Sequence, residues 1–371
     1  MNYLFLANIG ESLNFIFYIL IAILILLVMI TVHEFGHYIT GKIFGFGIEE
    51  FSIGFGPKIF SKRKKNGEVF SVRAIPLGGY CAFSGEDGES DDPKAFNNKK
   101  PWQRILVLIS GAFMNYLTAL LLICIMFGIY GHTAIMTYEV VEENKNYEYC
   151  LQDRDVLVKV EDKSVYLITD LIKVLDGKEK GEEVECEIIR SGKRQTINVK
   201  LLESANFSNV EDIEKLCSVL GVEYKALEDG TIDFGFRSTG IRLGFFENIG
   251  VSVKYSIKIA STIFVILGEL ITGAIGIKSL GGTVTTISMT ASAIKTGGLW
   301  SLLNIAGFIG VNLAVFNLLP FPALDGSRVV FAVVEWIRKK PINRRVEGLI
   351  HGVGFVLLLI FAIFIDLQQC F

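Results

Sequence analysis

The chain lacks the cysteine spacing and the charge that several classes of protein require. Its six cysteines include no C-x-x-C pair, which argues against a zinc ribbon, a thioredoxin motif or a dense disulfide framework. The net charge is only −3, so composition gives no electrostatic reason to expect nucleic acid as a partner. Histidine is scarce, with four residues in 371, and two of these lie four positions apart.

The N-terminal segment lacks the basic flank of a secretory signal. The first twelve residues carry one charge, Glu11, and no small-residue cleavage site follows. The next apolar run is also longer than the apolar core of a signal peptide. We therefore expect this run to be retained as a membrane span.

Apolar residues dominate the rest of the sequence. They make up 51% of it, with 28 phenylalanines and a mean hydropathy of +0.47, which is typical of a membrane protein. Runs without charge that are long enough to cross a bilayer as helices cover residues 12–32, 105–130, 299–324 and 349–365. The sequence predicts an α-helical polytopic membrane protein with four transmembrane helices.

One further apolar stretch is ambiguous. Residues 259–268 are uncharged, but Lys258, Glu269 and Lys278 interrupt the window around them. The uncharged part is about half of a membrane-spanning length. We expect an amphipathic helix at the membrane interface, within a linker region that covers residues 204–290.

Basic residues in the loops predict the orientation. Lysines and arginines gather between residues 42 and 100 and between residues 338 and 345, and such loops face the cytoplasm. Both termini and the large middle region then lie outside the cytoplasm, and any site at the end of the first span lies near the cytoplasmic side.

The middle region differs in composition from the spans. Residues 132–203 are polar, with alternating strand-like stretches joined by the turn Ser191-Gly192-Lys193 and one short helix over residues 168–175. This predicts an inserted α/β domain. It divides the chain into an N-terminal membrane core (1–131, with a loop at 48–86), this domain, the linker and a C-terminal membrane core (291–371).

The sequence His33-Glu34-Phe35-Gly36-His37 matches the H-E-x-x-H pattern of zinc peptidases. On a helix, the two histidines lie on one face and can bind one metal ion, while Glu34 can take a proton from water. The motif ends the first predicted span, where ionisable residues are costly and usually functional. We predict one Zn²⁺ bound by His33 and His37, with Glu34 as the catalytic base.

A catalytic zinc ion needs a third protein ligand. Glu49 and Glu50 in the next loop are possible, but Asp325 is the better candidate, because it follows the third run and therefore arrives at the same depth and side as the histidines. Pro320 and Pro322 break the helix just before it. Such broken backbone at membrane depth is tolerated where it lines a wet cavity.

Two asparagines lie in the same run. Asn317 abuts the break and Asn312 lies five residues earlier, so both could donate hydrogen bonds in that cavity. We predict that these asparagines, with Pro320 and Pro322, help to bind substrate. Contact between helices is the alternative role for Asn312.

Taken together, these motifs resemble the site-2 protease family of intramembrane zinc metalloproteases, in the bacterial regulator-of-sigma-E form with a single PDZ domain. The resemblance rests on His33-Glu34-x-x-His37, on the segment Asn317 to Gly326, on the loop motifs at 51–57 and 73–80, and on Gly111 to Asn115. It covers nearly the full chain. The Asp153-Arg154-Asp155 segment departs from the Gly-Asp usual in a PDZ domain.

The resemblance implies a multi-pass protein of the bacterial plasma membrane with an extracytoplasmic PDZ-like domain. It implies zinc binding by His33, His37 and Asp325, and regulated cleavage of single-pass membrane proteins such as anti-sigma factors or signal-peptide remnants. The segment that contains Gly78, Gly79 and Tyr80 would be a membrane-associated β-hairpin that holds substrate by strand pairing. The PDZ-like domain would bind peptides or act as a size filter.

Two other functions remain as alternatives. A catalytically silent chaperone or adaptor that binds membrane helices would keep the fold, but mere binding does not require Glu34. A metal transporter would usually show inverted repeats and several broken helices, whereas this sequence has one break and no repeat.

Overall fold

The computed structural model describes residues 2–86, 88, 90–141, 150–208, 212–226, 232–273, 276 and 281–370. The chain divides into two compact units, one formed by Met1–Met126 with Ile249–Phe371 and the other by Phe127–Asn248. The first is built mainly from long helices and the second mainly from β-strands.

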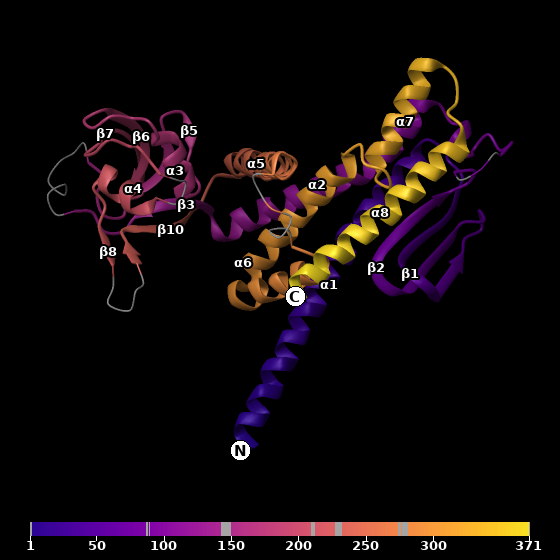
Figure 1. Ribbon diagram of the computed structural model, residues 1–371, viewed down its shortest axis with the longest axis horizontal. Coiled ribbons are helices and arrows are strands. Elements are labelled where there is room, and N and C mark those ends of the chain that lie inside the picture. The colour runs from indigo at the N-terminus through magenta and orange to yellow at the C-terminus, as the bar shows by residue number, and fades with distance from the viewer. Residues whose placement is uncertain are drawn as a thin grey trace. The chain divides into compact units, whose positions relative to one another are not determined.

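Long apolar helices form most of the first unit (Figure 1). They are α1 (Asn2–Ile43), α2 (Pro101–Tyr130), α5 (Phe245–Thr272), α6 (Thr283–Leu318) and α8 (Arg344–Cys370). All five are long and apolar enough to cross a membrane, so the predicted count of four is not confirmed. The additional candidate is α5. The apolar stretch at 259–268, predicted to be an interfacial helix, is part of this longer helix, which begins fourteen residues earlier at Phe245.

The third predicted span ends earlier than expected. Helix α6 stops at Leu318, because Pro320 lacks an N–H group and disfavours helical geometry in the residue before it. Leu319 is accordingly extended, with ψ of 142°. Asp325 then begins α7 (Asp325–Arg338), a 14-residue helix that the sequence pattern did not predict.

Glycines allow three of the helices to approach closely. A Cβ atom on Gly36 of α1 would lie 2.4 Å from the carbonyl oxygen of Ser110 on α2. On α6, Gly307 lies against Ile123 of α2 and Gly310 lies against Ala119. Small residues at such contacts are usual in membrane helix packing. Along α6 the residue number rises from 307 to 310, while the number of the contacted residue on α2 falls from 123 to 119. The two helices are therefore antiparallel.

The loop after α1 forms a bent β-hairpin of β1 (Ile48–Arg63) and β2 (Val69–Phe83), which are paired antiparallel. Both strands bend, so residues 50–53 lie between residues 69–72 and 79–82. Within the described residues, β2 pairs only with β1, so the segment 79–83 is an edge. Phe55, Ile59 and Phe60 are exposed near the bend of β1, as suits a membrane-associated hairpin.

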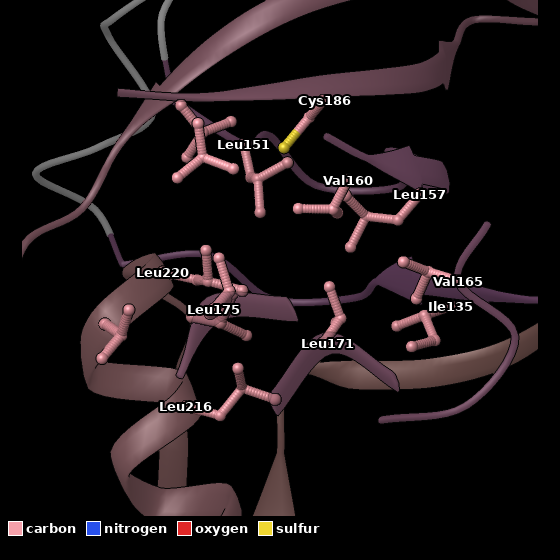
Figure 2. Packing of buried hydrophobic residues seen from close by; sticks show 14 of the residues in the cluster. Ile135, Leu151, Leu157, Val160, Val165, Leu171, Leu175, Cys186, Leu216 and Leu220 are labelled. Carbon is pink, nitrogen blue, oxygen red and sulfur yellow. The ribbon is translucent and has the colours of Figure 1, made fainter. Parts of the chain in front are cut away.

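The second unit is a β-sheet packed on two short helices. Its sheet has the order β10-β3-β4-β6-β7, with β5 paired to β4, and β8 and β9 form a separate hairpin. Figure 2 shows the core, in which Leu171 and Leu175 of α3 and Leu216 and Leu220 of α4 face sheet residues such as Leu157. The elements are β3 (His132–Thr137), β4 (Val156–Val160), β5 (Lys163–Ser164), α3 (Ile168–Leu175), β6 (Glu183–Arg190), β7 (Lys193–Lys200), α4 (Ile213–Leu220), β8 (Tyr224–Ala226), β9 (Ile232–Phe234) and β10 (Phe236–Ile241).

This unit is longer than the domain expected at 132–203. Strand β10 pairs with β3, and α4 adds buried leucines to the core, so residues up to Asn248 belong to the same unit. The sequence between 204 and 240 did not predict these elements, because its strands are too short to show a clear alternation of apolar and polar residues. Residues 209–211, 227–231, 274–275 and 277–280 of the expected linker lie outside the described residues.

Candidate metal centre and active site

Helix α1 brings the two histidines of the H-E-x-x-H motif together. Nε2 of His33 lies 3.1 Å from Nε2 of His37, and both side chains are buried. This follows from their four-residue spacing, which puts them on one face of the helix. Glu34 is partly exposed one residue further along the helix.

Asp325 completes a group of three donors. Its Oδ2 atom lies 2.9 Å from Nε2 of His33 and 3.2 Å from Nε2 of His37. Two imidazole nitrogens and one carboxylate oxygen are a set that binds zinc and leaves a coordination position open for water. Glu50, the alternative from the sequence, instead pairs with Arg73 and Lys58 on the hairpin.

The outer nitrogens of both imidazoles also have partners. Nδ1 of His37 donates to the carbonyl oxygen of Val107, 2.8 Å away, which leaves a lone pair on Nε2. Nδ2 of the Asn115 amide lies 3.4 Å from Nδ1 of His33, while its buried Oδ1 has no hydrogen-bond partner among the described residues. Turning the amide over exchanges the two atoms and brings the oxygen to Nδ1. An amide oxygen there can accept the Nδ1 proton of a metal-binding His33. The residues therefore fit a zinc ion.

A cavity of about 530 Å³ adjoins this group. Glu34, His37 and Asp325 line it, so the carboxylate of Glu34 and two of the three candidate metal donors face one space. The edge segment of β2 forms another wall, through Tyr80, Cys81, Ala82 and Phe83. The arrangement combines a candidate metal site, the carboxylate of Glu34 and a strand edge.

The glycines predicted to hold substrate lie on this edge. A Cβ atom on Gly79 would lie 3.5 Å from Cγ of Glu34, so the strand passes directly beside the H-E-x-x-H motif. Gly78 has φ of +148° and is covered by the ring of Phe55. The hydroxyl of Tyr80 accepts a hydrogen bond of 2.6 Å from Arg73.

The remaining predicted residues lie around the helix break. Asn312 and Asn317 are on α6, and neither lines the cavity described above. Pro320 and Pro322 lie in the segment between α6 and α7. Pro322 packs against Gly354 of α8, where a Cβ atom would lie 2.2 Å from the proline ring.

Sequence reasoning missed His351, which holds the same segment. Its Nδ1 accepts a hydrogen bond of 3.2 Å from the backbone N–H of Ala323, two residues before Asp325. Ala323 has φ of +75°, an uncommon conformation for a residue with a side chain. Asn115 was missed as an individual residue, although a polar side chain within an apolar span is itself a functional signal.

The hairpin of β1 and β2 lies outside the candidate membrane spans, and bonds between charged and polar side chains hold its strands together. Burial opposes ionisation of Glu50, but hydrogen bonds from Ser71, Arg73 and Lys58 outweigh it and lower its pKa to about 2. The carboxylate accepts from Oγ of Ser71 at 2.6 Å and from Nη2 of Arg73 at 2.9 Å. These bonds join β1 at Glu50 to the segment 71–73 of β2.

Comparison with known proteins identifies the chain's relatives. The model of peptidase family M50 matches residues 21–361. Two proteins named "Putative zinc metalloprotease" are 34% and 32% identical to the chain. The first, from Clostridium perfringens, aligns over 92% of this chain and 95% of its own length, and the second, from Fusobacterium nucleatum, over 94% and 97%. Zinc metalloprotease RasP of Bacillus licheniformis is 26% identical over 94% of this chain and 98% of its own.

Proposed function

Because this chain belongs to peptidase family M50 and is a zinc metalloprotease of the membrane, we propose that it hydrolyses peptide bonds within or beside the transmembrane segments of single-pass membrane proteins. One observation carries the proposal. His33, Glu34 and His37 lie within Phe15–Ile43, a helix apolar enough to span a membrane, and meet Asp325 there. A site at that depth can meet peptide bonds that a soluble protease cannot reach.

In this proposal, His33, His37 and Asp325 bind the zinc ion and Glu34 is the general base. Held by these residues, a zinc ion would supply Lewis acidity, which makes water ionise at about pH 7 and polarises a peptide carbonyl. The carboxylate of Glu34 takes the proton that water loses as it attacks, and then gives that proton to the departing amine. Asn115 and the carbonyl of Val107 hold the imidazoles in the orientation that binding requires.

The strand edge suggests how a helical substrate is handled. A helix keeps its carbonyl groups in hydrogen bonds, so a transmembrane substrate must unwind before water can attack. The edge at residues 79–83 can pair with the unwound segment and satisfy its backbone groups. Gly79 passes beside Glu34, so a strand paired here would carry its peptide bonds past the base. Asn312, Asn317, Pro320 and Pro322, at and before the helix break, would contribute further contacts to the substrate.

The direction of the helices supports four crossings. The part of α6 that follows its kink at Gly298 runs antiparallel to α2, as α1 does, so α2 ends and this part of α6 begins at the same end of the bundle. The chain between these two points therefore begins and ends on the same side of the membrane. This favours an interfacial position for α5, because a single crossing by α5 would put those points on opposite sides. We infer a bacterial plasma-membrane protein with its site near the cytoplasmic side, both termini outside and a PDZ-like extracytoplasmic unit.

The test is cleavage of model single-pass substrates, trimmed outside the membrane, by purified protein in lipid. Wild type is compared with Glu34→Gln, and zinc is measured on both. We expect about one zinc per chain in each and cleavage only by wild type, since the variant keeps the ligands and loses the base. If both hold zinc and neither cuts any of several substrates, a catalytically silent helix-binding protein becomes the better description.

A further inference from the structure

A second cavity, of about 330 Å³, lies between the start of α2 and the end of α7. Five of its lining residues carry positive charge and one carries negative charge. The lining residues used below are Lys99, Arg104, Glu335, Trp336, Lys339, Lys340 and Arg344. We refer to it as the basic cavity.

Among the described residues that line the basic cavity, Glu335 carries the one carboxylate, and it is already paired. Glu335 accepts a hydrogen bond from Nη1 of Arg104 at 2.6 Å and forms an ion pair with Nη2 of Arg344, 2.9 Å away. Arg104 and Glu335 are both almost fully buried, so they form a fixed floor. Arg344 also pairs with Glu347, 2.7 Å away, so the two arginines are balanced by two glutamates.

In the part of the chain that the structure describes, the charges of Lys99, Lys339 and Lys340 have no counterion. Among the described residues, no ion pair joins Lys99, Lys339 or Lys340 to a carboxylate, although Nζ of Lys99 donates to the carbonyl oxygen of Phe44. The buried Nε of Arg104 also lacks a hydrogen-bond partner in the described part of the chain. A cavity with this surplus of cationic donors fits an anion, and phosphate oxygens are suitable acceptors.

Its position is that of lipid headgroups. Pro101 and Arg344, which both line it, are the first residues of two candidate membrane spans. Beside it, α7 exposes an apolar stripe of Val330, Val333, Trp336 and Ile337, with tryptophan 55% and isoleucine 76% exposed. Exposed tryptophan next to lysine is characteristic of the membrane–water interface.

We propose that the basic cavity binds the phosphate of an anionic phospholipid, while the lipid's acyl chains lie against the apolar stripe of α7. Basic pockets beside membrane helices recognise such headgroups. The site is separate from the metal centre, but α7 connects them, since Asp325 is its first residue and Trp336 lies in its last turn. A bound lipid would thus hold the helix that carries the third donor.

The experiment measures lipid retention by the full-length protein, using native mass spectrometry after reconstitution in phosphatidylcholine nanodiscs with added phosphatidylglycerol. Lys339→Gln/Lys340→Gln is compared with wild type and with Lys62→Gln/Lys65→Gln. The control loses the same charge from exposed positions on the hairpin. We expect the affinity for phosphatidylglycerol to fall about 25-fold in the first variant, about fivefold per lysine, and to stay unchanged in the control.

Equal retention by wild type and Lys339→Gln/Lys340→Gln, with both equally stable in pure phosphatidylcholine, would overturn the proposal. Soluble glycerol phosphate provides a second arm. If it displaces the lipid and stabilises the protein equally well, the site takes a soluble phosphate ester rather than a membrane lipid. None of these measurements requires cleavage, so the result stands independently of the proposed protease substrates.

Discussion

Oδ2 of Asp325 lies 2.9 Å from Nε2 of His33, although 292 residues separate them in the chain. The contact joins the start of α7 to the C-terminal part of α1, and it depends on the direction of α6, which runs parallel to α1. Three features around this contact can be tested separately: the partner of His33, the close approach of α2, and the support of the segment before Asp325.

The first prediction concerns Asn115. Asn115→Leu removes the amide beside Nδ1 of His33, so the imidazole loses the group that orients it. We expect zinc affinity to fall about 10- to 100-fold, as for other residues that support metal ligands, with activity falling in parallel. Competition with a zinc chelator measures this. Asn304→Leu, on α6 and bonded to Tyr255, is the control and should keep its zinc.

The second prediction concerns the closest approach of α2 to the histidines. A Cβ atom on Gly111 would lie 2.5 Å from Nε2 of His37 and 2.7 Å from Cε1 of His33. Gly111→Ala must therefore push both rings aside, and we expect cleavage to fall about 100-fold, a typical effect of misplacement near 1 Å. Gly268→Ala on α5 meets nothing within 4 Å and should leave cleavage intact. Full activity in Gly111→Ala would contradict this packing.

The third prediction separates the two nitrogens of His351. An asparagine oxygen can take the place of Nδ1, whereas glutamine reaches toward the position of Nε2. His351→Asn should therefore keep the hydrogen bond from Ala323 and most of the activity. His351→Gln and His351→Leu leave that N–H without an acceptor, at a cost of about 1–3 kcal/mol. We expect lower kcat and weaker zinc binding with little change in KM; identical behaviour of all three variants would exclude a positioning role.

The fourth prediction is a pH dependence of the hairpin. The pKa of Glu50 is lowered in the folded chain to about 2 from its ordinary value of 4.5, so its ionised form is stabilised by folding. Its contribution is fully present above about pH 5 and is lost as the pH falls from 4.5 toward 2. Wild type should melt at higher temperature than Glu50→Gln at pH 7, and the difference should shrink below pH 4.5. A difference that grows on acidification would reverse the assigned sign.

Local sequence patterns determined several features of this protein. The uncharged runs predicted long apolar helices, because only such helices satisfy their backbone in lipid. The four-residue spacing of His33 and His37 placed them on one helix face. The two prolines ended α6 near the predicted break, since proline lacks an N–H group.

Only the tertiary structure decided which distant groups meet. Glu50 and Asp325 were both candidates for the third donor, and helix packing brought Asp325 to the histidines while Arg73 and Lys58 paired with Glu50. The supporting contacts of Asn115 and His351 join separate helices, so no local pattern contains them. Strand β10 likewise joined the inserted unit by pairing with β3, about a hundred residues away. Local spacing records periodicity along one element, whereas these contacts depend on how elements pack.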